Sequence, residues 1–244
     1  MHLEKVKITY LDHSGFAVET ENHLLIFDYF KDESEKGHRS LSNGVVGEED
    51  LKIHKDVIVF SSHSHGDHFN PVILKWRFWR PDIEYVLSDD IELEEEVSNV
   101  NFMGSYEEID LKAVKVKSYG STDIGLSFMV YVDGINIFHA GDLNWWYWWD
   151  DTAEEIEKAD RSFKEEVEKI LGEKIDIAFF PVDPRLEHNY SKGGLYFIEK
   201  LKPKYLVPMH FWGNFDVCSK FKSEAGGAST EVMEIRKRGQ SIFL

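Results

Sequence analysis

The sequence has few of the features on which secreted and membrane-spanning proteins depend. Cys218 is its only cysteine, so no disulfide can form within the chain. No apolar run approaches the roughly 20 residues that a membrane-spanning helix requires, and residues 1–6 lack the apolar stretch of a secretion signal. These absences predict a cytoplasmic protein that does not enter a membrane.

Basic residues are scarce relative to acidic ones. The 244 residues include 28 Lys and Arg against 45 Asp and Glu, a formal net charge of −17. An acidic protein repels nucleic acid and anionic membranes on average, so we expect a small-molecule partner rather than a nucleic acid. Charge and composition leave the oligomeric state open.

Linkers and repeats are missing as well. No segment rich in Pro, Gly or Ser divides the chain, and no repeat of fixed period or low-complexity tract occurs. A chain of 244 residues is long enough to bury a single large core. We therefore predict one domain over residues 1–244.

The sequence does contain a regular succession of short apolar runs, which predict strands and helices. The predicted strands cover residues 6–10, 16–20, 24–27, 56–61, 84–87, 114–118, 126–132, 135–139, 175–180 and 205–208. One predicted helix follows Asn70, and others cover residues 153–171, 193–201 and 230–237. Thr152 and Glu155 form a capping box, and Asp133-Gly134 predicts a hairpin turn. Residues 31–50 are polar and predict a surface excursion or lid.

The most informative segment covers residues 62–68, directly after the predicted strand at 56–61. It contains four metal-ligating side chains, His63, His65, Asp67 and His68. Crowded ionisable groups cost stability unless something neutralises them, and a bound cation does so. Alternate residues of an extended chain share a face, so His63 and His65 can reach one ion. Gly66 permits a turn that lets Asp67 and His68 face a second ion.

Two later residues stand in a similar position. Asp142 lies just beyond the predicted strand at 135–139, and His210 follows the predicted strand at 205–208. A lone Asp or His after a strand is ordinarily a turn or cap residue. The cluster at 62–68 needs partners from elsewhere in the chain, and this favours Asp142 and His210 as further ligands.

These motifs resemble the metallo-β-lactamase superfamily. Residues 63–68 match its HxHxDH signature, residues 138–142 resemble its strand ending in a bridging aspartate, and residues 209–211 resemble the segment with its last histidine. Residues 11–14 and 25–28 resemble the opening motifs of the subgroup containing the ascorbate-6-phosphate lactonases. The resemblance spans roughly residues 6–215 and implies an α/β fold, a four-layer αββα sandwich of two mixed sheets flanked by helices.

The resemblance also implies a ligand set. His63 and His65 would hold a first metal, Asp67, His68 and His210 a second, and Asp142 would bridge them. Family members usually add a histidine to the first metal, but no histidine occurs between Phe69 and Phe138. Ser121 or Asp123 occupies about the expected place.

Three alternatives follow from the missing histidine. Asp123 substitutes as an oxygen ligand, the first metal keeps an extra water, or only the second site fills firmly. In each case we expect reduced affinity at the first site. We expect one or two Zn²⁺ ions, with Mn²⁺ or Fe²⁺ also tolerated.

Such a centre predicts a hydrolase. Two cations about 3.5–4 Å apart can share a water, lower its pKa and polarise a substrate oxygen, so no Ser or Cys nucleophile is needed. Asp142 and Asp67 are the candidate catalytic residues, Asp67 first as a ligand and otherwise as a general base. We expect cleavage of an ester, lactone or phosphoester of a small metabolite. The alternatives are a superfamily nuclease or phosphodiesterase, a non-catalytic metal-binding protein and a di-iron oxidoreductase.

Histidines and an aspartate near the predicted ligands have open roles. His13 contacts the substrate or supports a ligand, or it makes a structural hydrogen bond. His139 is expected to orient the turn before Asp142 or to orient a ligand. Asp28 accepts a hydrogen bond from a ligand histidine or caps a turn.

Aromatic and charged residues predict a pocket wall. Residues 144–149 contain Trp145 and Trp146, which we expect to be divided between core and pocket, and Trp212 can join them. Asp183 and Arg185 contact the substrate at the rim, or form a salt bridge within their loop. Cys218 is expected to be a small, half-buried apolar residue in a loop rather than a nucleophile.

Overall fold

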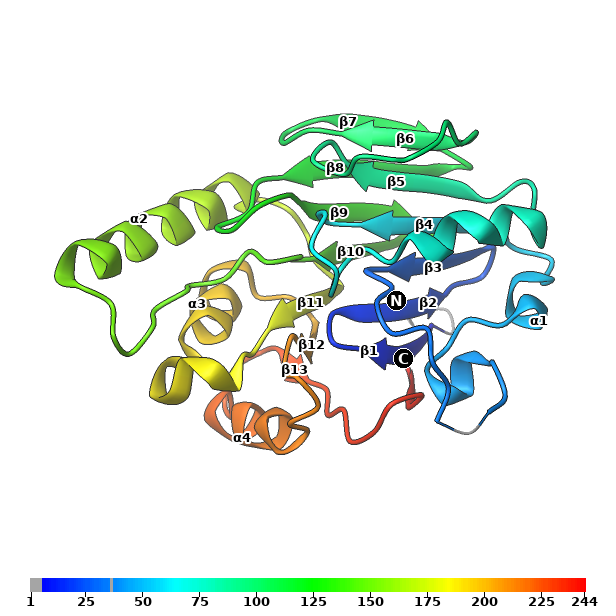
Figure 1. Ribbon diagram of the computed structural model, residues 1–244. Coiled ribbons are helices and arrows are strands. Elements are labelled where there is room, and N and C mark those ends of the chain that lie inside the picture. The colour runs from blue at the N-terminus through cyan, green and yellow to red at the C-terminus, as the bar shows by residue number, and fades with distance from the viewer. Residues whose placement is uncertain (1–5, 36) are drawn as a thin grey trace.

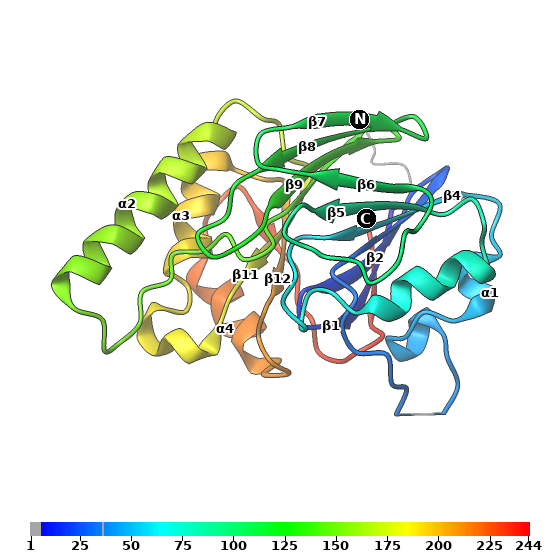
Figure 2. The same ribbon diagram turned by 45° about the horizontal axis from the view of Figure 1, so that its top comes forward.

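The computed structural model describes residues 6–35 and 37–244, and this part of the chain forms two seven-stranded sheets packed face to face (Figure 1). Both sheets contain parallel and antiparallel pairs. Helices cover the outer face of each sheet, α2 to α4 on one side and α1 on the other (Figure 2). The predicted αββα sandwich is therefore confirmed.

The first sheet is buried on both faces. Its strands, in spatial order, are β14 (Ser241–Phe243), β1 (Lys7–Asp12), β2 (Gly15–Glu19), β3 (His23–Phe27), β4 (Asp56–Ser61), β5 (Glu84–Ser88) and β6 (Val100–Met103). In β4, Ile58 and Phe60 face the core between the sheets, whereas Val57 and Val59 face the outer helical layer. Burial on both faces explains why β4 is a continuous apolar run rather than an alternating one.

The second sheet has a similar order, with one parallel and one antiparallel half. Its strands are β13 (Glu231–Val232), β12 (Tyr205–Met209), β11 (Ile177–Pro181), β10 (Ile135–His139), β9 (Ser127–Val132), β8 (Val114–Tyr119) and β7 (Glu108–Leu111). Asp133 and Gly134 join β9 to β10 with φ angles of 46° and 75°. Two successive positive φ angles are typical of a type I′ turn, so the predicted hairpin is confirmed.

Helices α2 (Ala153–Ile170), α3 (Lys192–Leu201) and α4 (Asp216–Glu224) pack on the second sheet. The predicted capping box of α2 is present, because Thr152 Oγ1 accepts from the backbone N–H of Glu155 and the Glu155 carboxylate accepts from that of Thr152. Phe163, Val167 and Ile170 form its buried face. Because these residues fall three or four apart, one stripe of α2 meets the core.

The outer layer of the first sheet consists of short helices. They are η1 (Leu41–Asn43), α1 (Glu48–Leu51) and the 3₁₀ helix η2 (Pro71–Phe78), and a further 3₁₀ helix, η3 (Pro184–Asn189), follows β11. Asn70 caps η2 by accepting from the backbone N–H of Val72. Of the segment predicted as a surface excursion or lid, residues 31–35 and 37–40 are exposed or half-buried, whereas Val45 and Val46 are completely buried in this outer layer.

The predicted helix at 230–237 is wrong. Glu231 and Val232 instead form β13, which pairs with β12 at the sheet edge, and the helix of this region is α4. Val232 and Ile235 are both buried and lie three residues apart, a spacing typical of a helix face. The open edge of β12 offers backbone partners that outweigh this local pattern. Cys218 consequently lies buried on α4, not in a loop.

Short edge strands escaped the sequence analysis. β6, β7 and β14 have three or four residues each and carry few buried side chains. Among the described residues, no helix is both long enough and apolar enough to cross a bilayer.

Candidate metal centre

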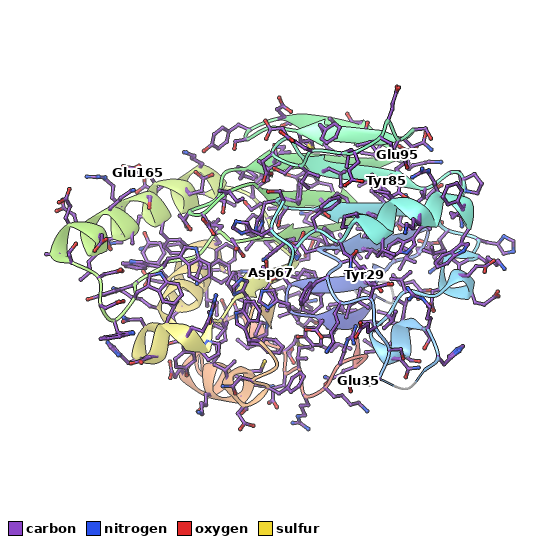
Figure 3. The ribbon with its side chains drawn as sticks, in the orientation of Figure 1. Tyr29, Glu35, Asp67, Tyr85, Glu95 and Glu165 are labelled. Atoms are coloured by element: carbon purple, nitrogen blue, oxygen red, sulfur yellow. The ribbon has the colours of Figure 1, made fainter. Side chains whose placement is uncertain are left out.

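The ends of parallel strands from both sheets meet at one edge of the sandwich, as is usual for binding sites in α/β proteins. The residues that follow these strands are Asp28 after β3, His63 after β4, Asp142 after β10, Asp183 after β11 and His210 after β12. The loop after β4 also carries Asp67, which Figure 3 shows between the N-terminal strands (blue) and the C-terminal elements (yellow to orange).

Among the described residues, three groups of side chains place possible metal-ligating atoms within 4.8 Å of one another. The groups are His13, Asp67, His68 and His210; His63, His68 and Asp142; and His65, Asp123 and Asp142. The structure thus brings together the side chains predicted as ligands and adds His13. Ser121 is in none of these groups, and its hydroxyl accepts from the backbone N–H of Asp123 instead.

Asp142 lies at the centre of these groups. Its Oδ1 is 3.2 Å from His68 Nε2 and 3.3 Å from His210 Nε2, and its Oδ2 is 3.6 Å from His63 Nε2. One carboxylate therefore faces three imidazoles, two from the HxHxDH segment after β4 and one from the end of β12. This is the geometry that a bridging ligand requires.

Hydrogen bonds on the far side of the rings orient these histidines. His68 Nδ1 lies 2.7 Å from Asp28 Oδ2, and His210 Nδ1 lies 2.9 Å from Asp183 Oδ2. A carboxylate only accepts, so each Nδ1 donates and each Nε2 faces the centre. His63 Nδ1 is held similarly, 3.0 Å from Ser62 Oγ.

Asp183 is placed differently from the expectation of a rim residue. Its side chain is completely buried and contacts both His210 and Arg185. Arg185 makes the expected salt bridge within its loop, with 2.5 Å between Nη2 and Asp183 Oδ2. Asp183 therefore orients a candidate ligand instead of meeting the substrate.

The centre concentrates negative charge that its surroundings partly compensate. Burial opposes ionisation of Asp142, but the adjacent His68, His210 and His63 hold the pKa of its carboxyl well below its usual range. Burial likewise disfavours charged His68, yet the carboxylates of Asp142 and Asp28 outweigh it and raise the pKa of His68 to about 10. The ionised buried carboxylates therefore depend on positive charge at this centre, which a protonated His68 or a bound cation can supply.

Unpartnered atoms support the fit of a cation. In the described part of the chain, His68 Nε2 and Asp142 Oδ1 are buried without a well-directed hydrogen bond, although they lie 3.2 Å apart, and both ring nitrogens of His13 are buried without one as well. A buried polar atom without a partner costs about 1–3 kcal/mol. Imidazole nitrogens and carboxylate oxygens are ligands of Zn²⁺, Mn²⁺ and Fe²⁺, so these residues fit a divalent metal.

The loop at 120–125 presses against the HxHxDH segment. Gly125 has φ 78°, and a Cβ atom there would lie 2.2 Å from Ser62 O and 2.3 Å from His63 Cβ. Only glycine allows this approach together with that backbone conformation. Glu166 of α2 anchors the start of the loop by accepting from the backbone N–H of Gly120 at 2.7 Å. The sequence analysis did not identify Glu166. Its only distinguishing feature in the sequence is its position next to the apolar face of α2.

His139 is buried outside the ligand groups. Its Nδ1 accepts from the backbone N–H of Gly141 at 3.2 Å, and its Nε2 lies 2.9 Å from Ser14 O. His139 therefore orients the turn that carries Asp142.

A cavity of about 450 Å³ opens over the centre. Its lining includes Trp146, Trp148 and Trp212, together with Arg185 and Asp123. The Arg185 guanidinium lies over two of these rings, 4.9 Å from the Trp212 centroid and 5.5 Å from the Trp148 centroid. The cavity thus combines aromatic walls with one basic group and several carboxylates.

The expected division of the aromatic segment between core and cavity is present, because Trp146 lines the cavity and Trp145 does not. The ring of Trp145 packs in the core against Phe163 and Tyr196. Thr122 also lines the cavity, and its hydroxyl donates to Asn144 O at 2.6 Å. Neither Thr122 nor Trp148 had been singled out from the sequence.

Comparisons with known proteins agree with this architecture. The family model described as the beta-lactamase superfamily domain matches residues 7–210. A UPF0173 metal-dependent hydrolase of Pyrococcus furiosus is 26% identical, over 98% of this chain and 100% of that one.

Solved structures share the fold at low identity. Igni18, a metallo hydrolase of Ignicoccus hospitalis, has a TM-score of 0.64 at 18% identity and covers 98% of both chains. CmlA, a diiron β-hydroxylase of Streptomyces venezuelae, has a TM-score of 0.62 at 10% identity, over 100% of this chain and 54% of that one. Because the family match spans most of the residues and the fold agrees, the chain belongs to the metallo-β-lactamase superfamily.

Proposed function

We propose that this protein is a metal-dependent hydrolase that cleaves an ester, lactone or phosphoester bond of a small metabolite. The observation that carries the proposal is the convergence of His63, His68 and His210 on Asp142 beneath a cavity of about 450 Å³. The hydrolase names of several relatives support it.

The donor groups suggest how the chain would hold its metals. His65 and Asp123, with His63 whose Nε2 lies 3.1 Å from His65 Nδ1, would hold one ion. Asp67, His68 and His210 would hold the other, and Asp142 would join them. When bound, such ions lower the pKa of water and polarise the oxygen of a carbonyl or phosphoryl group.

The protein's own groups would supply orientation and proton transfer. Asp28 and Asp183 hold His68 and His210 in position. Asp67 is half-buried and lines the cavity, so it is placed to exchange a proton with a bound substrate in addition to acting as a ligand.

The cavity favours a compact substrate. Its volume suits a small molecule, and Trp146, Trp148 and Trp212 offer faces for a ring or an acyl chain. Arg185 is the one Lys or Arg among the described residues that line it, enough to meet a single carboxylate or phosphate. A polynucleotide would require more positive charge, which argues against a nuclease.

A substrate panel tests this proposal. Metal-loaded protein is assayed on lactones, carboxylic esters, phosphomonoesters and phosphodiesters, beside Asp142→Ala and the control His54→Ala, an exposed histidine outside the site. We expect hydrolysis of one class that Asp142→Ala and a chelator both abolish and His54→Ala leaves unchanged. Bound metal without any turnover would instead indicate a non-catalytic metal-binding protein.

A second candidate is a di-iron oxidoreductase. Asp123 places a carboxylate within 4.8 Å of donor atoms of His65 and Asp142, and two histidines with one carboxylate are a ligand set typical of non-haem iron. The fold similarity to a diiron β-hydroxylase adds support. Iron as the bound metal, together with oxygen uptake in the presence of a reductant, would favour this function over hydrolysis.

A further inference from the structure

His13 lies beside the buried part of the centre although it is far from the HxHxDH segment in sequence. It follows β1 in the turn to β2. Its Nε2 is 3.3 Å from Asp67 Oδ2, and its ring centroid is 4.0 Å from that of His210. His13, Asp67, His68 and His210 offer ligand atoms that all lie within 4.8 Å of one another.

The imidazole of His13 is buried, and the 3.3 Å contact of its Nε2 with Asp67 Oδ2 lacks hydrogen-bond geometry. The residue is 1% exposed, and in the described part of the chain neither ring nitrogen has a hydrogen-bond partner. His139 shows what a structural histidine looks like in the same protein, because both of its nitrogens contact backbone groups. Packing alone therefore does not explain why an imidazole is buried at this position. The place of His13 among three candidate ligands indicates that its partner is a bound cation.

The backbone holds His13 in this position. Its φ angle is 51°, a left-handed conformation that non-glycine residues rarely adopt. Its N–H donates to Tyr10 Oη at 2.8 Å, and its carbonyl accepts from the N–H of His210 at 3.2 Å. An unusual conformation that several contacts maintain is characteristic of functional positions.

We infer that His13 is an additional ligand of the metal position formed by Asp67, His68 and His210. The inference rests on the proposed metal centre and deepens it. It gives this position three imidazoles and one carboxylate in addition to Asp142, whereas the other position, with His63, His65 and Asp123, has two imidazoles and one carboxylate. The position with His13 should therefore bind a divalent first-row metal more tightly and fill first.

Metal binding rather than activity provides the test. Metal-free protein is titrated with Co²⁺ in competition with a chromophoric chelator, and X-ray absorption of the singly loaded protein counts imidazole ligands. We expect three imidazoles in the wild type and two in His13→Ala. His13→Ala should weaken the tighter site by about 10–100-fold, the size of effect known for residues that tune metal sites.

Two further variants make the result specific. His13→Asn tolerates the left-handed backbone but is too short to reach the ion, so it tests the assignment if His13→Ala does not fold. His65→Ala alters the other position and should leave the tighter site unchanged. Unaltered tight binding in both folded His13 variants would overturn this inference alone. A wild type that binds no metal would overturn the proposed function as well.

Discussion

The two halves of the candidate metal centre differ in burial and in how their side chains are held. The buried half contains His13, His68 and His210, each at most 2% exposed. The other half contains the buried His63 together with His65 and Asp123, which are both exposed. Carboxylates behind the rings orient His68 and His210, whereas the Nδ1 of His65 contacts only the neighbouring His63 Nε2 at 3.1 Å among the described residues.

This contrast separates two requirements of a hydrolytic centre. Ligands that the fold orients in advance bind a cation without losing much conformational freedom. Exposed ligands must be ordered when the ion binds, which costs entropy, but they leave the ion accessible to a substrate. We interpret the buried half as the permanent position and the exposed half as the one that fills last, with Asp67 and His210 of the buried half also lining the cavity.

The largest effect is expected for Asp142→Ala, because this carboxylate faces both halves. Metal content should fall at both positions, and hydrolysis should drop by about 10³-fold, as when a principal group that stabilises charge in the transition state is removed. Elemental analysis and rate measurements check this, with His54→Ala as the control. Retention of one tightly held ion would assign Asp142 to a single half and break the comparison.

The second largest effect is expected on the stability of the metal-free protein, which should depend more on the buried half of the metal centre than on the exposed half. His210→Ala leaves Asp183 and Asp142 buried without this partner, so it should lower the free energy of unfolding by about 2–4 kcal/mol. His65→Ala, at an exposed side chain, should change it by no more than about 0.5 kcal/mol. Urea unfolding in the presence of a chelator measures both, and equal losses would contradict the assigned difference in burial.

Substitutions of Asp123 test the metal affinity of the exposed half of the centre. Asp123→His introduces the imidazole that the family usually supplies, and it should raise the Zn²⁺ affinity of the weaker site by about tenfold. Asp123→Ala should lower that affinity by a similar factor. Competition titrations with Zn²⁺ and Mn²⁺ check both variants, and unchanged affinities would indicate that Asp123 is not a ligand.

The smallest effect is expected at Glu166, which anchors the loop carrying Asp123. Glu166→Gln keeps an acceptor for the Gly120 N–H but removes its charge, so it should destabilise the protein by only about 0.5–1 kcal/mol. It should also reduce affinity at the exposed half only. Glu165→Gln is the matched control, because Glu165 is exposed on the same helix (Figure 3). A loss at the buried half would show that the loop supports the whole centre.

Site residues that the sequence predicts are marked by a pattern of neighbouring residues. The roles that only the structure reveals depend on contacts with residues far away in the sequence. The HxHxDH segment places His63, His65, Asp67 and His68 within six residues, so its pattern is visible without a fold. Asp183 and Glu166 act through contacts across 27 and 46 positions, and nothing near them in sequence indicates the partner. Trp145 and Trp146 are adjacent, yet only the packing of Trp145 against Phe163 directs one ring to the core.

The sequence by itself determined the apolar periodicity of the central strands, the turn at Asp133-Gly134 and the metal-ligating types at strand ends. These depend on neighbours a few residues apart, where local sterics and alternation act. Only the tertiary structure decided that residues 231–232 extend a sheet and that a turn after the first strand brings His13 beside His210. Both depend on which distant segments meet, because hydrogen bonding at a sheet edge and burial at a strand junction are properties of the assembled chain.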